Sequence, residues 1–489
     1  MFFITEALSW ATGVPEPTLR LLTTLMLAYP VANFYNKLYI RPLLNNQPIK
    51  TTESDRNSFI LLSGLALAFY YNGRAIYHSL VTVAVSYAIC YLGDHFQDRR
   101  LATAGVWVFN TAYLLLGYYF TSSDDYDISW TMTQCILCLR LMGFSFDFQD
   151  GADAEALAAS EAPKTGNPLP LSFANDTPLK ELPEFAQVLA YTFFPSAFLV
   201  GPQFSFSLYK RWLKAPYGGK PVSEWEETQK AQLMYMYRCV GLAILYLAVQ
   251  QVIGSQYPTS YLLTDDYAAL PLFKRLFIFW MAGRFTFNKY IGVWMLTEGA
   301  STLFGISYDG EDKDGQARFD GLANALPNVY ELTTTIDNVI ASFNINTNLW
   351  AKYYVFKRLR FLGNKNISQF ATLGFLAIWH GFHIMYFVTF ALEFLYIQCE
   401  LVLRRRIVPS VKPLTSRNDI YKAVWKVVAW LTCTSTTSYA VVGFDLLKVG
   451  KAWTAYKNVY FIGHLAIVII LGVNALLGKP SRPLKKKIM

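Results

Sequence analysis

The stretch from Leu373 to Leu395 reads LGFLAIWHGFHIMYFVTFALEFL, and apart from two histidines, Thr389 and Glu393 it is apolar. A helix that crosses a lipid bilayer needs about 20 mostly apolar residues, which this stretch supplies. His380 and His383 lie within it. An ionisable side chain at bilayer depth is costly and usually faces a cavity with a functional role. His380 is therefore the leading candidate for the chemistry of this protein.

The composition of the chain is that of a membrane protein with many spans. Of its 489 residues, 53% are hydrophobic and 16% are charged, and the mean hydropathy is +0.25. The net charge of +9 is concentrated in short polar segments between apolar runs, such as Arg99-Arg100 and Arg404-Arg405-Arg406. Cationic clusters at such places set membrane topology and bind lipid headgroups. We therefore expect membrane lipids, and not nucleic acid, as partners.

Hydropathy predicts an all-α polytopic fold with about eleven spanning helices. We expect one membrane-embedded domain over residues 1–489, with N-terminal helices in 1–150, a helical core in 185–480 and a basic tail in 481–489. The predicted spans lie near residues 17–36, 57–72, 76–93, 101–120, 128–147, 185–206, 234–254, 274–304, 368–396, 421–447 and 457–477.

A second unusual segment precedes the histidines. Asn344, Asn346 and Asn348 alternate with other residues, Trp350 follows, and aromatic residues then interleave with basic ones that include Lys357 and Arg358. From the pattern alone, the segment fits an amphipathic helix at the membrane interface whose N-terminus is capped by the Asn side chains.

Taken together, these segments resemble the membrane-bound O-acyltransferase family, and within it the lysophospholipid acyltransferase branch. The resemblance is carried by Asn344 through Trp350, by Lys357-Arg358 and by Trp379-His380-Gly381. Further matching stretches are residues 198–204, 294–299 and 460–464, so that the likeness extends from about Tyr191 to the C-terminus. It implies a helical bundle around an acyl-transfer chamber that opens to both the cytosol and the membrane.

The resemblance implies that His380 is the catalytic base and Asn344 its partner. A neutral imidazole, with a reference pKa of about 6.5, can accept the proton of an attacking hydroxyl near neutral pH. Asn344 either donates a hydrogen bond to the developing oxyanion or orients the imidazole, and the sequence leaves both roles open. The expected reaction transfers a fatty acyl group from acyl-coenzyme A to the sn-2 hydroxyl of a lysophospholipid. Acyl-coenzyme A is thus a substrate, and no permanently bound cofactor is expected.

Several other residues are expected to bind substrate, and the acceptors expected from the resemblance are choline, ethanolamine and serine lysophospholipids. Lys357 and Arg358 are candidates for the phosphates of coenzyme A, although they could equally set topology. Glu298 is an intramembrane carboxylate that we expect to line the chamber or to pair with a cation such as Arg284. The full set of expected substrate-binding residues is Asn346, Asn348, Trp350, Lys357, Arg358, Trp379, His383 and Glu298.

His383 follows His380 by three residues, which would place both on one side of a single helix. The spacing alone could suggest a metal, but no carboxylate or Cys accompanies the pair within two turns and the pattern HExxH is absent. We predict no metal site, and we expect His383 to hydrogen-bond near the catalytic residue.

The C-terminal residues Lys486-Lys487-Ile488-Met489 resemble the di-lysine retrieval signal of endoplasmic reticulum membrane proteins. This predicts a multi-pass protein of that membrane with a cytosolic C-terminus. The N-terminus lacks a basic region and a small-residue cleavage site, so we expect no removable signal peptide.

Two alternative functions remain open on the sequence. The same chemistry could serve a sterol, a diacylglycerol or a protein acceptor. In a lipid transporter or scramblase, by contrast, His380, Glu298 and Arg140 would line a polar path across the membrane. The sequence does not fix the oligomeric state, and a homodimer is one arrangement that it allows.

Overall fold

The computed structural model describes residues 3–44, 52–121, 128–153, 169–174, 176–415 and 418–478. Over these residues the chain is helical, and the only β structure consists of two isolated bridges, between Glu311 and Ala317 and between Ala325 and Phe343. The predicted all-α class is therefore confirmed. Lys486 and Lys487 lie outside the described residues.

The helices follow one another along the chain with short connections. The N-terminal ones are α1 (Phe3–Thr12), α2 (Glu16–Tyr35), α3 (Arg41–Leu44), α4 (Glu53–Asn72), α5 (Ile76–His95), α6 (Arg99–Thr121) and α7 (Trp130–Asp150). The central ones are α9 (Phe185–Thr192), α10 (Phe206–Lys214), α11 (Trp225–Val252), α12 (Asp265–Ala268), α13 (Leu272–Phe304), α14 (Pro327–Glu331), α15 (Ile336–Ser342) and α16 (Ile345–Ala351). The C-terminal ones are α17 (Lys365–His380), α18 (Ile384–Arg406), α19 (Val408–Thr415), α20 (Asp419–Leu446), α21 (Val449–Asn458) and α22 (Ile462–Leu476).

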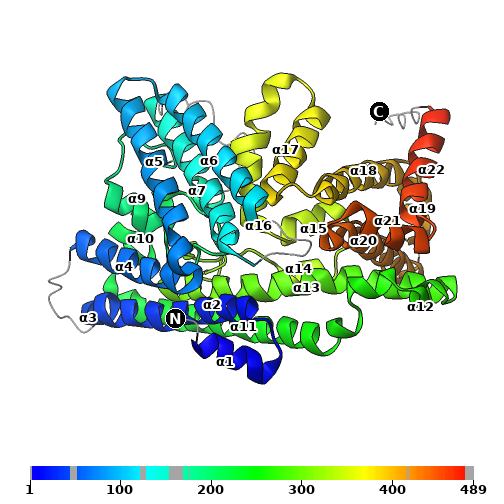
Figure 1. Ribbon diagram of the computed structural model, residues 1–489, viewed down its shortest axis with the longest axis horizontal. Coiled ribbons are helices and arrows are strands. Elements are labelled where there is room, and N and C mark those ends of the chain that lie inside the picture. Colours follow the sequence, from blue (N-terminus) through cyan, green and yellow to red (C-terminus); the bar gives the residue numbers. More distant parts are fainter. Residues whose placement is uncertain are drawn as a thin grey trace, which may run out of the picture.

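Three groups of helices surround the centre of the molecule (Figure 1). Helices α5, α6 and α7 pack on one another on one side. The long helices α11 and α13 pack along each other below, and α13 also contacts α2 and α20. Helices α18, α20 and α22 form the third group. The short helices α15 and α16 lie between these groups, and this arrangement places the Asn segment in the interior.

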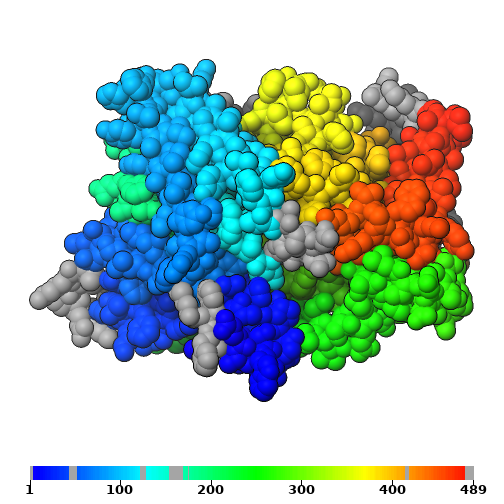
Figure 2. Space-filling model, in the orientation of Figure 1, coloured from blue at the N-terminus to red at the C-terminus, as the bar shows by residue number. Residues whose placement is uncertain are grey.

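Helix α17 completes the ring around the centre. It packs on α18 and touches α6. In the space-filling view it forms a ridge between the α5–α7 block and the orange and red C-terminal helices (Figure 2). The N-cap residue Asn364 starts this helix, because its side chain accepts a hydrogen bond from the backbone N–H of Asn366 at 2.9 Å.

Several of the helices are long and apolar enough to span a membrane. Five segments of the described chain meet this test, namely Glu53–His95, Arg99–Thr121, Val222–Leu263, Ile384–Arg406 and Asp419–Leu446. A sixth is obtained if α21 and α22, which meet at an angle of 78°, are counted as one broken span. The multi-pass membrane character is supported, whereas the predicted number of about eleven spans is not confirmed.

The predicted span near 185–206 is wrong, because the helix stops at Thr192. The segment that follows is irregular and folds around the guanidinium of Arg140, which donates hydrogen bonds to the backbone carbonyls of Tyr191 at 2.8 Å, Ala197 at 3.0 Å and Pro202 at 3.1 Å. A cation buried to 1% exposure thereby satisfies carbonyl groups that no helix pairs.

The predicted continuous span over 368–396 is also wrong. Helix α17 ends at His380, and Gly381 adopts φ +128° and ψ −169°, a conformation that is essentially restricted to glycine. The chain turns there and α18 begins at Ile384. His380 and His383 therefore belong to two helices, and the prediction that they share a helix face fails.

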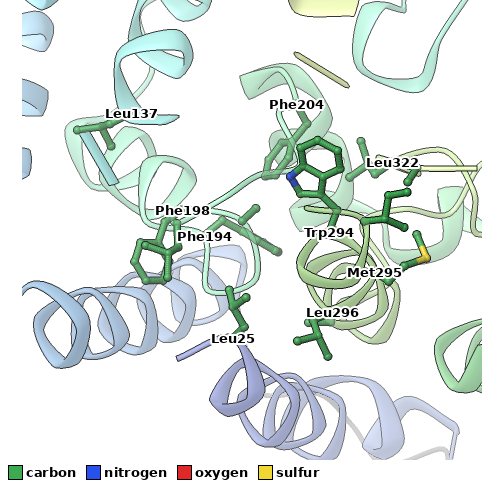
Figure 3. Close-up of a cluster of buried hydrophobic side chains, with 14 of the residues drawn as sticks. Leu25, Leu137, Phe194, Phe198, Phe204, Trp294, Met295, Leu296 and Leu322 are labelled. Carbon is green, nitrogen blue, oxygen red and sulfur yellow. The ribbon is translucent and has the colours of Figure 1, made fainter. Parts of the chain in front are cut away.

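The core between the three groups is largely aromatic and aliphatic. Figure 3 shows Phe194 and Phe198 of the irregular segment beside Leu25 of α2, with Trp294 and Leu296 of α13 nearby. All five side chains are at most 8% exposed and belong to one buried cluster. This packing fixes α13 against the N-terminal helices and so supports one wall of the central cavity.

Candidate active site

A cavity of about 220 Å³ lies between α13, α15, α16, α17, α18 and α20. Its walls are mostly apolar and aromatic, with Trp294, Phe343, Leu376 and Phe444 among them. The polar side chains at its surface include those of His380 and Asn344. Residues 36 positions apart in the sequence thus meet at one chamber, as the sequence predicted.

His380 reaches the cavity because it is the last residue of α17. Its ring is surrounded by aromatic rings, with centroid separations of 4.6 Å to Trp379, 5.4 Å to Tyr386, 5.6 Å to Phe390 and 5.0 Å to Phe444. Within the described chain, neither ring nitrogen of His380 has a hydrogen-bond partner. The imidazole is therefore held by packing while its nitrogens stay available for a substrate.

The end of α17 is fixed from outside the cavity. The indole N–H of Trp379 donates to the backbone carbonyl of Cys135 at 2.9 Å, and the hydroxyl of Tyr118 donates to the carbonyl of Trp379 at 3.0 Å. Trp379 also lines the cavity with its ring. These bonds tie the residue before His380 to α6 and α7, so Trp379 acts as an anchor as well as a wall.

Asn344 occupies a left-handed conformation, with φ +50° and ψ +45°, at the start of α16. Asn tolerates this conformation better than most residues. Its side chain makes no capping hydrogen bond, and no other described residue bonds to it. The interpretation of Asn344 as an ordinary helix cap is therefore wrong, and its amide faces the cavity uncommitted.

The backbone on both sides of Asn344 is held by a neighbouring strand-like segment. Phe343 forms a bridge with Ala325, and the N–H of Ile345 donates to the carbonyl of Asn324 at 3.0 Å. The N–H of Asn346 donates to the side-chain oxygen of Asn324 at 3.1 Å. Asn324 is thus the direct support of the segment that presents Asn344.

Glu298 in turn holds Asn324. Its carboxylate accepts a hydrogen bond from the backbone N–H of Asn324 at 3.0 Å and another from the hydroxyl of Tyr235 at 2.7 Å. The side chain is 1% exposed and does not line the cavity. The expected pairing with Arg284 is wrong, because Arg284 binds Glu331 instead.

The other Asn residues and Trp350 act mainly as structural ties. Asn346 is 3% exposed, and its amide donates to the carbonyls of Leu322 and Ala323, away from the cavity. Asn348 lines the cavity, yet its amide donates to the carbonyls of Ile340 and Phe343. The indole N–H of Trp350 donates to Leu139 at 2.9 Å.

The basic residues after α16 lie outside the cavity. The ammonium nitrogen of Lys357 is 3.7 Å from the centre of the Tyr353 ring. Arg358 makes a two-pronged contact with the carboxylate of Asp150, at 3.1 and 2.5 Å, and covers the ring of Phe146. The charge of Arg358 is therefore already balanced by Asp150.

His383 and Arg140 are also separate from the chamber. His383 precedes α18 and packs edge-on against Tyr386, with centroids 5.7 Å apart, and it is not part of the cavity wall. Neither Arg140 nor Glu298 lines the chamber with His380. The polar path that a transporter or scramblase would need from these three residues is not formed.

One cavity residue was not among the expected site residues. Glu393 of α18 lines the chamber together with His380 and Asn344. The signal was present in the sequence, because Glu393 is the single carboxylate of the apolar run from Leu373 to Leu395. No group of three or more His, Cys, Asp or Glu suited to a metal occurs in the described part of the chain.

Comparison with known proteins bears directly on this chamber. The model of the membrane-bound O-acyltransferase family matches residues 115–444, which contain every cavity-lining residue. The lysophospholipid acyltransferase 5 of Drosophila melanogaster is 34% identical over 469 residues, covering 95% of this chain and 88% of the relative. The lysophospholipid acyltransferase 5 of Homo sapiens is 32% identical over 488 residues, covering 98% and 93%. A lysophospholipid acyltransferase of Schizosaccharomyces pombe is 28% identical over 484 residues, covering 96% and 88%.

Proposed function

Because this chain belongs to the membrane-bound O-acyltransferase family, we propose that it transfers a fatty acyl group from acyl-coenzyme A to the sn-2 hydroxyl of a lysophospholipid. Relatives that align along nearly its whole length carry the name lysophospholipid acyltransferase. The observation that carries the proposal is one cavity in which His380 and Asn344 both have uncommitted side chains.

In the proposed reaction, His380 is the general base. A neutral ring nitrogen accepts the proton of the sn-2 hydroxyl while the hydroxyl oxygen attacks the carbonyl carbon of the thioester. The negative charge then gathers on the former carbonyl oxygen, where the amide of Asn344 donates a hydrogen bond. When the carbon–sulfur bond breaks, the thiolate of coenzyme A leaves and takes the proton from the imidazolium. The products are a diacyl phospholipid and free coenzyme A.

The walls of the chamber support this role. Aromatic and aliphatic side chains exclude water, which limits hydrolysis of the thioester and strengthens hydrogen bonds to the developing charge. The ring of His380 lies among Trp379, Tyr386, Phe390 and Phe444, so its orientation is restricted before substrate binds. An acyl chain fits an apolar chamber of this kind.

The donor is acyl-coenzyme A, a substrate whose phosphates require cations at the mouth of the chamber. Lys357 is the better candidate of the predicted pair, because Arg358 is bound to Asp150. The acceptors that we propose carry choline, ethanolamine or serine headgroups. The proposed location is the endoplasmic reticulum membrane, with a cytosolic C-terminus that carries Lys486 and Lys487.

The experiment is a thiol-trapping assay on purified protein in detergent. Free thiol should be released from acyl-coenzyme A only when a lysophospholipid is added, in step with formation of diacyl phospholipid. The His380→Ala variant should elute as folded protein and release thiol at a rate at least about 10³-fold lower.

The assay also separates the alternatives. Acyl transfer to a sterol, a diacylglycerol or a peptide, with none to lysophospholipids, would replace the acceptor and keep the chemistry. Full turnover by His380→Ala would overturn the catalytic assignment.

A further inference from the structure

Glu393 is a carboxylate in the wall of the chamber that the proposed mechanism does not use. It lies on α18 with Thr389 one turn before it and Tyr396 one turn after it, and all three line the cavity. Within the described chain, no hydrogen bond or ion pair joins Glu393 to another residue. A polar atom in such a place is costly unless a partner meets it.

No protein cation meets this carboxylate. The residues that line the cavity in the described chain include no Lys and no Arg, and Glu393 is the one acidic residue among them. A ligand is therefore the remaining source of a positive partner, and a cationic group that entered the chamber would meet Glu393.

The other walls suit an organic cation. Tyr290, Trp294 and Tyr396 line the same cavity, and the rings of Tyr290 and Trp294 lie 5.9 Å apart. The faces of such rings attract ammonium groups, including quaternary ones that cannot donate hydrogen bonds. Aromatic rings and a carboxylate together form the usual chemistry for an alkylammonium group.

The distance from the reacting atoms is also suitable. Phe390, one turn before Glu393, contacts the ring of His380 with centroids 5.6 Å apart. Three residues of α-helix advance about 4.5 Å along the axis. The sn-2 hydroxyl of an acceptor at His380 would therefore leave its headgroup within reach of the Glu393 region.

We propose that Glu393 binds the ammonium group of the lysophospholipid headgroup and thereby sets the headgroup preference. This inference rests on the function proposed above. Lysophospholipids with choline, ethanolamine or serine carry that ammonium, whereas lysophosphatidylglycerol is anionic and lacks it. Glu393 therefore favours the first group and repels the second.

The test compares Glu393→Gln with the unaltered protein on lysophosphatidylcholine, lysophosphatidylethanolamine, lysophosphatidylserine and lysophosphatidylglycerol, with one acyl-coenzyme A donor. The variant should raise KM for the three ammonium acceptors about tenfold or more, as expected for the loss of a charged contact. The kcat/KM for lysophosphatidylglycerol should stay the same or rise. Glu226→Gln, at an exposed position on α11, is the matched control and should change neither value.

The outcomes separate this inference from the proposed function. If the unaltered protein acylates no lysophospholipid, the proposed function fails. If it does, and Glu393→Gln reduces transfer to all four acceptors equally or changes none, only the headgroup role is overturned. Should Glu393→Gln not yield folded protein, Glu393→Asp decides, because it keeps the charge. It should keep the preference for ammonium acceptors, and loss of that preference with folded protein would overturn the role.

Discussion

The carboxylate of Glu298 accepts the backbone N–H of Asn324 at 3.0 Å, and Asn324 in turn receives the N–H groups of Ile345 and Asn346. A buried acid on α13 therefore supports the backbone on which Asn344 stands, without touching the cavity itself. Glu298 is a positioning residue, and its effect on catalysis should pass through the placement of Asn344.

Replacing Glu298 by Ala should lower kcat about 10–100-fold, since displacement of a catalytic group by 1 Å can cost about 10²-fold. The KM for acyl-coenzyme A should change little. Two hydrogen-bond donors lose their acceptor, so the melting temperature should fall as well. Glu298→Gln, which keeps one acceptor oxygen, should show smaller losses in both. Steady-state kinetics and thermal unfolding in detergent measure these values. A fall in melting temperature with unchanged kcat would show that Glu298 serves stability alone.

Substitutions at Asn344 should separate backbone strain from chemistry. Asn344→Gly suits φ +50° and should fold normally, yet lose about 10²–10³-fold in kcat because the amide is missing. Asn344→Ala adds about 1 kcal/mol of strain and should also lower the melting temperature. Asn344→Asp keeps the shape and removes the donor. If Asn344→Asp retains kcat, donation to the oxyanion is not the role of this residue.

Gly381 controls where His380 points. A Cβ at this position would meet only ordinary contacts, with Tyr386 at 3.6 Å and Tyr118 at 3.7 Å, so space is not the obstacle. The obstacle is φ +128°, which costs a non-glycine residue about 1–3 kcal/mol. Gly381→Ala should lower kcat at least about tenfold by moving the end of α17. Kinetics and thermal unfolding of the purified variant are the measurements.

Gly374 provides the matched control within the same helix. A Cβ there meets nothing within 4 Å, and the residue is helical. Gly374→Ala should therefore leave kcat unchanged and stabilise α17 by up to about 1 kcal/mol. Equal effects of the two substitutions would contradict the special role of Gly381.

Lys357 and Arg358 should respond differently to substitution, although they are neighbours. Lys357→Ala should raise the KM for acyl-coenzyme A with little change in melting temperature. Arg358→Ala leaves Asp150 without its partner and should mainly lower the melting temperature. The double exchange Arg358→Asp with Asp150→Arg should recover part of that loss. An unchanged KM in Lys357→Ala would remove this residue from the coenzyme A site.

The sequence by itself determined the class of the protein and its two central residues. Apolar runs of about 20 residues can satisfy their backbone groups in lipid only as helices, so composition was enough to predict an all-α membrane fold. The ordered segments around Asn344 and His380 were specific enough to indicate the family, because the residues of one reaction chamber keep their order along the chain.

Only the tertiary structure decided how the chamber is built. The glycine at 381 ends one helix and starts another, a break that hydropathy cannot detect because both sides are equally apolar. The partner of Glu298 is a backbone N–H and not a cation. The place of Glu393 beside His380 depends on the angle between α17 and α18. Each of these features arises from contacts between segments, and such contacts follow from packing in three dimensions and not from local pattern.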